Sequence, residues 1–400
     1  MNTRFGDPRV WELVDKGVTI ADPWTISIGP EVNLDRISNE GVVLHPGTRV
    51  RGATTVISAG STLSTETPMT IEDCQLGPGV ELAGGYASGA VFLEGASMGS
   101  GAHVRGGSIL EEHASGAHTV GLKQTILFPH VTLGSLINFC DALMAGGTDA
   151  KNHSEVGSSY IHFNFTPDGD KTTASLFGDV PRGVLVNQRP VFLGGQGGAV
   201  GPVTTGFGVV VGAGSVLRAD VDEDDVLIIP EPVPGMVRPN KRHRYKRLNG
   251  LLEKNLRYIG SLVALQNWYA QARAPFFAQA ELGDLVLQGA LAALRSGHAE
   301  RVKRLKALIG KLEADEPARA ELIENATALL AGCDAIEVAG PIDLLDHLRD
   351  QAAAGQGYLP TIQSLDETLA ASATSWLTDV IDQVSGAAAE AAPQLGLFAS

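Results

Sequence analysis

Aliphatic side chains recur every six positions through the first 240 residues, and glycines fall at fixed places between them. A period of six excludes an amphipathic helix, whose period is 3.6, and the longer alternating strands of a β-sandwich. Each six-residue unit is expected to form one short strand, whose aliphatic residue points into the coil, and one tight corner, with three units closing a turn. We therefore predict a left-handed parallel β-helix. The spacing joins Leu44 to Val50 and Val56, Leu76 to Leu82, Met98 to Val104 and Leu110, Leu127 to Leu133, and Val211 to Leu217.

After residue 241 the apolar pattern becomes helical. Leu248, Leu252, Ile259 and Val263 fall close to one face of a helix. The composition changes at the same place, because 36 of the 48 glycines precede residue 241. We predict an α-helical domain of about five helices, which packs or oligomerises and covers the open end of the β-helix. The residues expected to separate these helices are Pro275, Gly297, Pro317, Pro341 and Pro360.

These patterns divide the chain into three parts. Residues 1–25 form a lead-in segment, residues 26–235 form the β-helix, and residues 241–400 form the helical domain. The β-helix is predicted to carry inserted loops near 138–175 and 178–192, where the period of six is lost. Insertions into a repetitive scaffold are common places for binding and catalytic groups.

Composition narrows the classes of partner. The formal net charge of −15 argues against nucleic acid, which needs a basic surface. The sequence contains no run of about 18 apolar residues, so we predict no membrane-spanning segment. The first 22 residues lack an apolar core typical of a signal peptide, so we expect a cytoplasmic protein. The three cysteines are widely spaced and predict neither a disulfide framework nor a zinc knuckle.

The region from residue 130 to residue 171 is rich in polar side chains and contains three histidines, His130, His153 and His162. His153 lies between Lys151 and Glu155, which could orient its ring, so it is our candidate general base. The alternative is a corner histidine that only hydrogen-bonds the backbone. Three histidines could also hold zinc, but they lack close spacing on one strand, and we predict no metal.

Residues 17–229 resemble the acetyltransferase domain of the bifunctional enzymes that make UDP-N-acetylglucosamine. The most specific motif runs from Glu155-Val-Gly-Ser-Ser-Tyr to Asp168-Gly-Asp-Lys171, and residues 203–221 resemble the final coils of that domain. The resemblance implies the same fold, acetyl-CoA as the acyl donor and a homotrimer. The chain lacks a match to the family's uridyltransferase domain, so diphosphorylase activity is not implied.

Four residues match positions that contact substrate in this family. Arg105 and Lys123 match the two basic residues that hold the sugar phosphate and uridyl phosphates. Their spacing of 18 residues corresponds to one full turn, which would place the two cations one above the other. Asn164 matches the family's substrate asparagine, and Lys171 matches its lysine near the acceptor.

The family's catalytic positions and its acetyl-CoA channel can also be located in this sequence. The catalytic histidine of the family falls on Ser135, and its partner tyrosine falls on Asn138, which we retain as a substrate-binding candidate. Ser158, Gly195 and Ala213 fall on positions that line the acetyl-CoA channel.

Three functional hypotheses follow. The first is an acetyl-CoA-dependent acyltransferase acting on a sugar phosphate or nucleotide sugar, such as glucosamine 1-phosphate. The second is a protein that binds a sugar nucleotide without catalysis, because serine replaces the family's base. The third is a structural scaffold.

Overall fold

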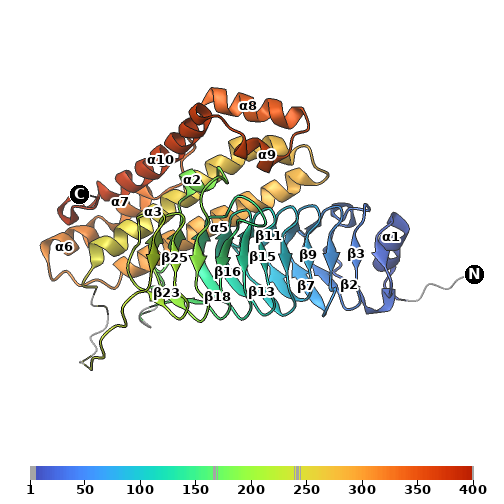
Figure 1. The fold of residues 1–400 in the computed structure, drawn as a ribbon, viewed down its shortest axis with the longest axis horizontal. Helices are drawn as coiled ribbons and strands as arrows, with labels where there is room; N and C mark the ends of the chain where they lie inside the picture. Colours follow the sequence, from blue (N-terminus) through green and yellow to red (C-terminus); the bar gives the residue numbers. More distant parts are fainter. Residues whose placement is uncertain are drawn as a thin grey trace, which may run out of the picture.

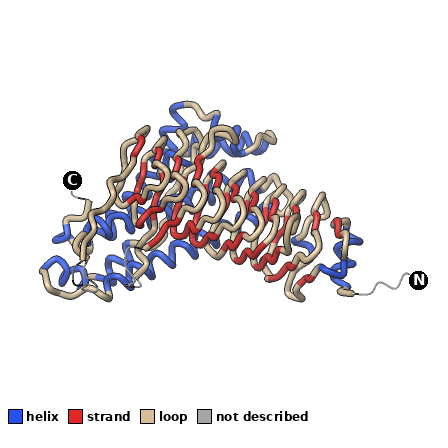
Figure 2. The backbone as a smooth tube through the Cα atoms, turned by 60° about the horizontal axis from the view of Figure 1, so that its bottom comes forward, coloured by secondary structure: helices blue, strands red, loops and turns tan. Residues whose placement is uncertain are grey.

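The first half of the protein is a β-solenoid of about eleven turns, and a helical domain follows it (Figure 1). The computed structural model describes residues 6–164, 168, 170–237, 239, 243 and 245–398. All paired strands of the solenoid run parallel, which confirms the predicted architecture of stacked coils. Short strands follow one another along the solenoid, and helices gather along one side of it (Figure 2).

One face of the solenoid is an 11-stranded parallel sheet, which we name the long sheet. It receives one strand from each turn. In spatial order its strands are β1 (Thr19–Ile20), β3 (Val43–Leu44), β6 (Thr62–Leu63), β9 (Glu81–Leu82), β12 (Ser97–Met98), β15 (Ser115–Gly116), β17 (Val131–Leu133), β19 (Ser154–Val156), β22 (Phe192–Leu193), β25 (Val210–Val211) and β27 (Leu227–Ile228).

The other two faces belong to one 16-stranded sheet, because β16 (Gly121–Leu127) and β18 (Asn138–Met144) continue around the corner between them. The open face contains the first halves of β16 and β18 together with β2 (Ser27–Ile28), β4 (Arg49–Arg51), β7 (Met69–Glu72), β10 (Gly85–Ser88), β13 (Ala102–Val104), β20 (Ile161–Phe163), β23 (Gly198–Val200) and β26 (Val216–Leu217). The covered face contains their second halves together with β5 (Val56–Ile57), β8 (Gln75–Leu76), β11 (Val91–Phe92), β14 (Ile109–Leu110), β21 (Ser175–Phe177) and β24 (Thr204–Thr205).

Corner residues between the open and covered faces adopt the left-handed backbone conformation. Gly107 has φ 75°, which glycine adopts at no steric cost. In the next two coils Gln124 and Asp141 have φ 52° and 56° at the same corner. The amide of Gln124 donates to the carbonyl of Gly106 in the preceding coil at 3.3 Å, which helps to hold the corner in place.

Strands of the covered face carry two aliphatic residues with different roles. Phe92 and Leu110 pack inside the solenoid, whereas their neighbours Val91 and Ile109 join the core of the helical domain. The prediction that Val56 points inward is therefore wrong. Val56 belongs to the helical core, and Ile57 beside it fills the interior.

Helix α1 (Pro8–Lys16) closes the N-terminal end of the solenoid (Figure 1). Its buried residues Val10 and Leu13 join the apolar column of the coils. Asp7 caps the helix by accepting a hydrogen bond from the amide of Arg9, and Lys16 donates to the carbonyl of Leu34 at 2.8 Å. The first coil begins at β1, inside the segment predicted as a lead-in, since β1 pairs with β3.

The helical domain lies along the side of the solenoid rather than over its end, so the predicted end cap is wrong (Figure 1). Helix α5 contacts β8 and β11, and Leu227 and Ile229 of the last coil remain 70% and 72% exposed. Gly297 lies inside α5 and does not end a helix. The helices are α3 (Leu248–Trp268), a π-helical turn (Tyr269–Arg273), α4 (Ala274–Phe277), α5 (Gly283–Ile309), α6 (Pro317–Glu324), α7 (Ala326–Gly332), α8 (Ile342–Ala353), α9 (Tyr358–Gln363) and α10 (Glu367–Ala389).

The predicted loop over 138–175 is largely coil of the solenoid. Residues 138–144 form β18, and β19 and β20 continue the same two sheets, so the regular strands extend through this polar region. Residues 146–153 lie outside the named strands, as do Asn164 and residues 170–174. Residues 178–191 lie outside the regular strands and contain the short helix α2 (Val180–Gly183).

Candidate functional site

Two cations lie on adjacent coils of the open face. His103 and Val104 of β13 pair with Gly121 and Leu122 of β16, and the amide of Arg105 donates to the carbonyl of Leu122 at 2.9 Å. This register places Arg105 beside Lys123, about 4.8 Å away along the sheet. Arg105 is exposed and Lys123 is half-buried. The two side chains can therefore approach one anionic group together.

A shallow hollow of about 300 Å³ opens beside these cations. Arg105 lines it, together with residues of the next coil such as Val120 and Gly121. Small residues at Gly101 and Gly121 leave the space unfilled. Its lining residues are Gly101, His103, Arg105, Thr119, Val120, Gly121, Ile137 and Asn138.

Asn138 lies one coil beyond Gly121, so the structure brings it to the same hollow as Arg105. The thiol of Cys140 donates to Asn138 Oδ1 at 3.1 Å, and a guanidinium nitrogen of Arg105 lies 4.0 Å from the sulfur. Burial raises the pKa of Cys140, which keeps the thiol neutral. We infer that this thiol positions Asn138 and does not act as a nucleophile.

His103 is an imidazole at the hollow that sequence reasoning missed. It is exposed, and its ring lies 5.4 Å from the ring of Tyr86. The hydroxyl of Tyr86 donates to Glu72 at 2.8 Å, which fixes the neighbouring ring. The alternation of His103, Val104 and Arg105 could have revealed this position, because residues two apart on a strand share a face.

The candidate base His153 lies elsewhere. It precedes β19 of the long sheet, and its Nδ1 lies 3.0 Å from the carbonyl of Ala150. Its Nε2 lies 3.7 Å from Glu155. These contacts orient the ring as expected from the flanking residues, but none of them involves the residues of the hollow.

The other two histidines of the polar region are buried. His162 on β20 has Nδ1 2.6 Å from the carbonyl of Cys140 and Nε2 2.7 Å from the hydroxyl of Ser175. Burial lowers its pKa to about 4, so the ring is neutral near pH 7. His130 stacks on His113 at 5.4 Å, and burial lowers its pKa as well. Both serve packing in the solenoid.

Asn164 and Lys171 lie beyond the strands that carry the two cations. Asn138 pairs with Ile161, and Asn164 is an exposed residue directly after β20. Lys171 is exposed at a corner, and its carbonyl accepts a hydrogen bond from Arg301 of α5 at 3.5 Å. The same arginine binds Asp141 at 2.8 Å, so α5 fixes the corner that follows Cys140. Residues 165–167 and 169 lie outside the described residues.

Ser158, Gly195 and Ala213 occupy one corner in three successive coils. The amide of Gln196 donates to the carbonyl of Ser158 at 2.7 Å, and the amide of Gly214 donates to that of Gly195 at 2.9 Å. Ser135 continues this corner in the preceding coil, because its amide donates to the hydroxyl of Ser158 at 3.1 Å. The structure thus aligns the three candidate acetyl-CoA residues in a row of small side chains.

Among the residues that the structure describes, no group of three or more His, Cys, Asp or Glu side chains could hold a metal ion. None of the helices in this part of the chain is long and apolar enough to cross a membrane.

No profile of a known protein family matches the chain. Curated proteins named bifunctional protein GlmU are similar over about half of it. The protein from Thermotoga petrophila is 27% identical over 215 residues, which are 53% of this chain and 42% of the relative. The protein from Trichlorobacter lovleyi is 29% identical over 222 residues, 55% of this chain and 43% of the relative. The protein from Paenarthrobacter aurescens is 31% identical over 205 residues, 51% of this chain and 36% of the relative.

The chain thus spans less than half the length of these relatives. The similarity and the solenoid agree with the resemblance to the acetyltransferase domain stated above. Slightly more than half of this chain is homologous to bifunctional GlmU proteins, and its β-solenoid is consistent with the left-handed β-helix of their acetyltransferase half.

Proposed function

We propose that the open face binds a sugar phosphate or nucleotide sugar, such as glucosamine 1-phosphate, and catalyses its acetylation by acetyl-CoA. The observation that carries this proposal is the placement of Arg105 and Lys123 on adjacent coils beside a hollow. A guanidinium can hold two phosphate oxygens at once, and a lysine adds a second positive charge. Asn138, Asn164 and Lys171 are proposed to bind the rest of the substrate.

The proposed chemistry is direct transfer without a covalent enzyme intermediate. The neutral amine nitrogen attacks the thioester carbonyl carbon, and an imidazole at the hollow, His103, accepts the proton that the nitrogen loses as this bond forms. The carbon–sulfur bond of the tetrahedral intermediate then breaks. CoA leaves as a thiolate, which takes up the proton. The small residues Ser158, Gly195 and Ala213 are exposed or half-buried, and we propose that they leave room along this corner for the extended CoA chain.

A second candidate function is sugar-nucleotide binding without catalysis. Ser135 stands where the resemblance places the base, and the imidazole of His162 is buried inside the coil. His153 contacts Glu155 at a different corner. This candidate retains the phosphate clamp but assigns no proton acceptor to it.

We also propose a homotrimer, in which a second subunit would complete the shallow hollow on the open face. Size-exclusion chromatography coupled to light scattering measures the mass of the assembly directly. A mass of three chains is expected, and a monomer at micromolar concentration would contradict this assembly.

Release of free CoA from acetyl-CoA, with glucosamine 1-phosphate as acceptor, tests the proposed function. Lys123→Ala is expected to abolish turnover, and His103→Gln is expected to lower kcat by about 100-fold or more. His153→Gln is the matched control and should keep wild-type rates. Tight substrate binding without any turnover would favour the second candidate. If His153→Gln alone abolished turnover, the assignment of the base would be wrong.

A further inference from the structure

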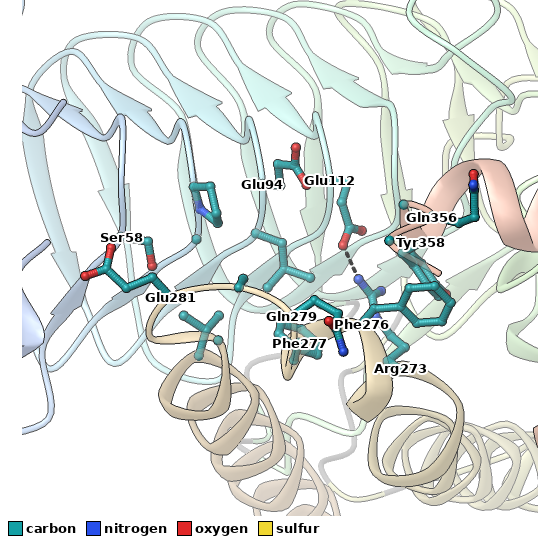
Figure 3. Close-up of a pocket in the computed structure, with 18 residues that line it drawn as sticks. Ser58, Glu94, Glu112, Arg273, Phe276, Phe277, Gln279, Glu281, Gln356 and Tyr358 are labelled. Atoms are coloured by element: carbon teal, nitrogen blue, oxygen red, sulfur yellow. Dashed lines mark hydrogen bonds and ion pairs between the residues drawn. The ribbon is translucent and has the colours of Figure 1, made fainter. Parts of the chain in front are cut away.

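A second cavity, of about 260 Å³, lies between the solenoid and the helical domain (Figure 3). It follows the row of coils at the border of the covered face and the long sheet. Ser58, Leu93 and Glu112 line it from the solenoid, while Phe277 and Glu281 line it from the helical domain. It shares no residue with the hollow on the open face.

At one end of this cavity Arg273 is enclosed by aromatic rings and carboxylates. Its guanidinium carbon lies 4.0 Å from the ring centre of Tyr358 and 4.7 Å from that of Tyr269. The side chain is 2% exposed and forms ion pairs with Glu111, at 3.2 Å, and with Glu112. The hydroxyl of Tyr269 donates to Glu111 at 2.6 Å. The two carboxylates thus pair with the terminal nitrogens of the guanidinium, whereas its Nε has no hydrogen-bond partner among the described residues.

A carboxylate oxygen and a hydroxyl in the cavity wall also have no hydrogen-bond partner among the described residues. Glu112 is 8% exposed, and its Oε2 has no hydrogen-bond partner among the described residues. The hydroxyl of Ser58, which is 1% exposed, also has none there. Figure 3 shows the Glu112 carboxylate reaching from the solenoid toward Arg273, with Ser58 and Glu281 at the other end of the cavity. Buried polar groups are nearly always paired, so these atoms point to a bound partner, and the Glu112 oxygen requires that this partner donate a hydrogen bond.

The cavity is long, because its solenoid wall spans four coils. Strands β5, β8, β11 and β14 pair in succession, and the residues that follow them include Ser58 and Glu111. Three strand spacings separate the two ends, which is about 14 Å. Exposed carboxylates of Glu94 and Glu281 lie between and beside these ends, and Glu281 accepts a hydrogen bond from Ser38 at 2.5 Å.

A carboxylate only accepts hydrogen bonds, so the missing partner must be a donor and is best satisfied by a cation. The wall between the carboxylates is apolar and aromatic, formed by Leu93, Phe276 and Phe277. Aromatic faces favour ammonium groups and the carbon chain between them. We propose that this cavity binds a linear aliphatic polyamine, with one ammonium group on Glu112 and another near Glu281.

Calorimetric titration of the full-length protein with spermidine tests this proposal, and its readout does not depend on acetyl transfer. Spermidine should bind more tightly than the shorter putrescine. Glu112→Gln should weaken spermidine binding by about tenfold or more, since it removes a charged acceptor. Glu94→Gln, at an exposed position that the fold does not need, should weaken it by about threefold. The control Glu81→Gln, an exposed carboxylate on the long sheet, should change nothing.

Three results would overturn the proposal. Spermidine at millimolar concentration could produce no binding heat. Glu81→Gln could weaken binding as much as Glu94→Gln, which would mean attraction to the acidic surface in general. Magnesium could bind the cavity as tightly as spermidine and displace it, which would make the site one for a simple cation.

Discussion

The open and covered faces of the solenoid belong to one sheet and differ mainly in the residues that point outward. Strand β16 contributes to both. Its Lys123 points outward on the open face, and its Ile126 points outward on the covered face and joins the helical core. The inward residues, Leu122 and Leu127, are alike and belong to one apolar column.

The difference shows how one scaffold makes two kinds of surface. Burying an outward aliphatic side chain contributes about 1.5–3 kcal/mol, so a row of them holds the helical domain in place. Charged side chains at the equivalent positions of the covered face would lose their hydration under the helices. The charged side chains lie instead on the open face, where water reaches them. The outward aliphatic residues of the covered face are Val56, Val91, Ile109, Ile126, Leu143 and Leu176.

The largest effect is expected from a charge on the covered face. Val91 is fully buried where β11 contacts α5, so Val91→Asp should lower the free energy of unfolding by about 4 kcal/mol or more. The control is Ser97→Asp, because Ser97 points outward from the long sheet in the same coil. It should change the free energy of unfolding by less than about 0.5 kcal/mol. Urea unfolding followed by circular dichroism measures both. Equal losses would mean that the faces do not differ in this way.

Breaking the buried charges at the border of the covered face should cost nearly as much. Arg273→Met leaves Glu111 and Glu112 without their cation and should destabilise the protein by about 3–5 kcal/mol. Arg182 forms partly exposed pairs with Asp179 and Asp224, and Arg182→Met is the control, with an expected cost of about 1 kcal/mol or less. A smaller loss for Arg273→Met than for the control would rule out this role for the buried pair.

The same cluster should make stability depend on pH. Burial raises the pKa of Glu111 from its usual value of 4.5 to about 7. Between these values the folded protein binds more protons than the unfolded chain, so stability should fall as pH rises from 4.5 to about 7. The loss is on the order of 1–3 kcal/mol. Glu111→Gln should flatten the profile in this window, and parallel profiles for the two proteins would refute the assignment.

The smallest effect on stability is expected on the open face. Arg105→Ala and Lys123→Ala remove cations whose charges remain accessible to solvent, and each should change the free energy of unfolding by less than about 0.5 kcal/mol. Thermal and urea unfolding of the two variants measure this. A loss above about 1 kcal/mol for either would mean that the cation serves the fold.

The six-residue period was enough to predict the coils, because the interior column takes mostly aliphatic side chains at a fixed phase. The covered face also had a signal that we did not use: its strands carry pairs such as Val91-Phe92 and Ile109-Leu110, where strands elsewhere carry a single inward residue. Such pairs indicate apolar contacts on both sides of a strand.

The candidate site was predictable only in part. The 18-residue spacing of Arg105 and Lys123 matches one coil, and the register places the two residues side by side. His153 was chosen for its neighbours in the chain, whereas stacking joins residues one coil apart. Local sequence could not reveal that His103 lines the hollow while His153 lies on the long sheet, because the position of each corner depends on the length of every preceding coil.

A double-mutant cycle on the phosphate clamp tests the central claim most directly. Glucosamine 1-phosphate is titrated calorimetrically into the wild type, Arg105→Ala, Lys123→Ala and the double variant. If both cations hold one phosphate, each single variant loses most of the affinity, and the two effects couple by about 1 kcal/mol or more. Strictly additive losses, or wild-type affinity in either single variant, would contradict a shared clamp on the open face.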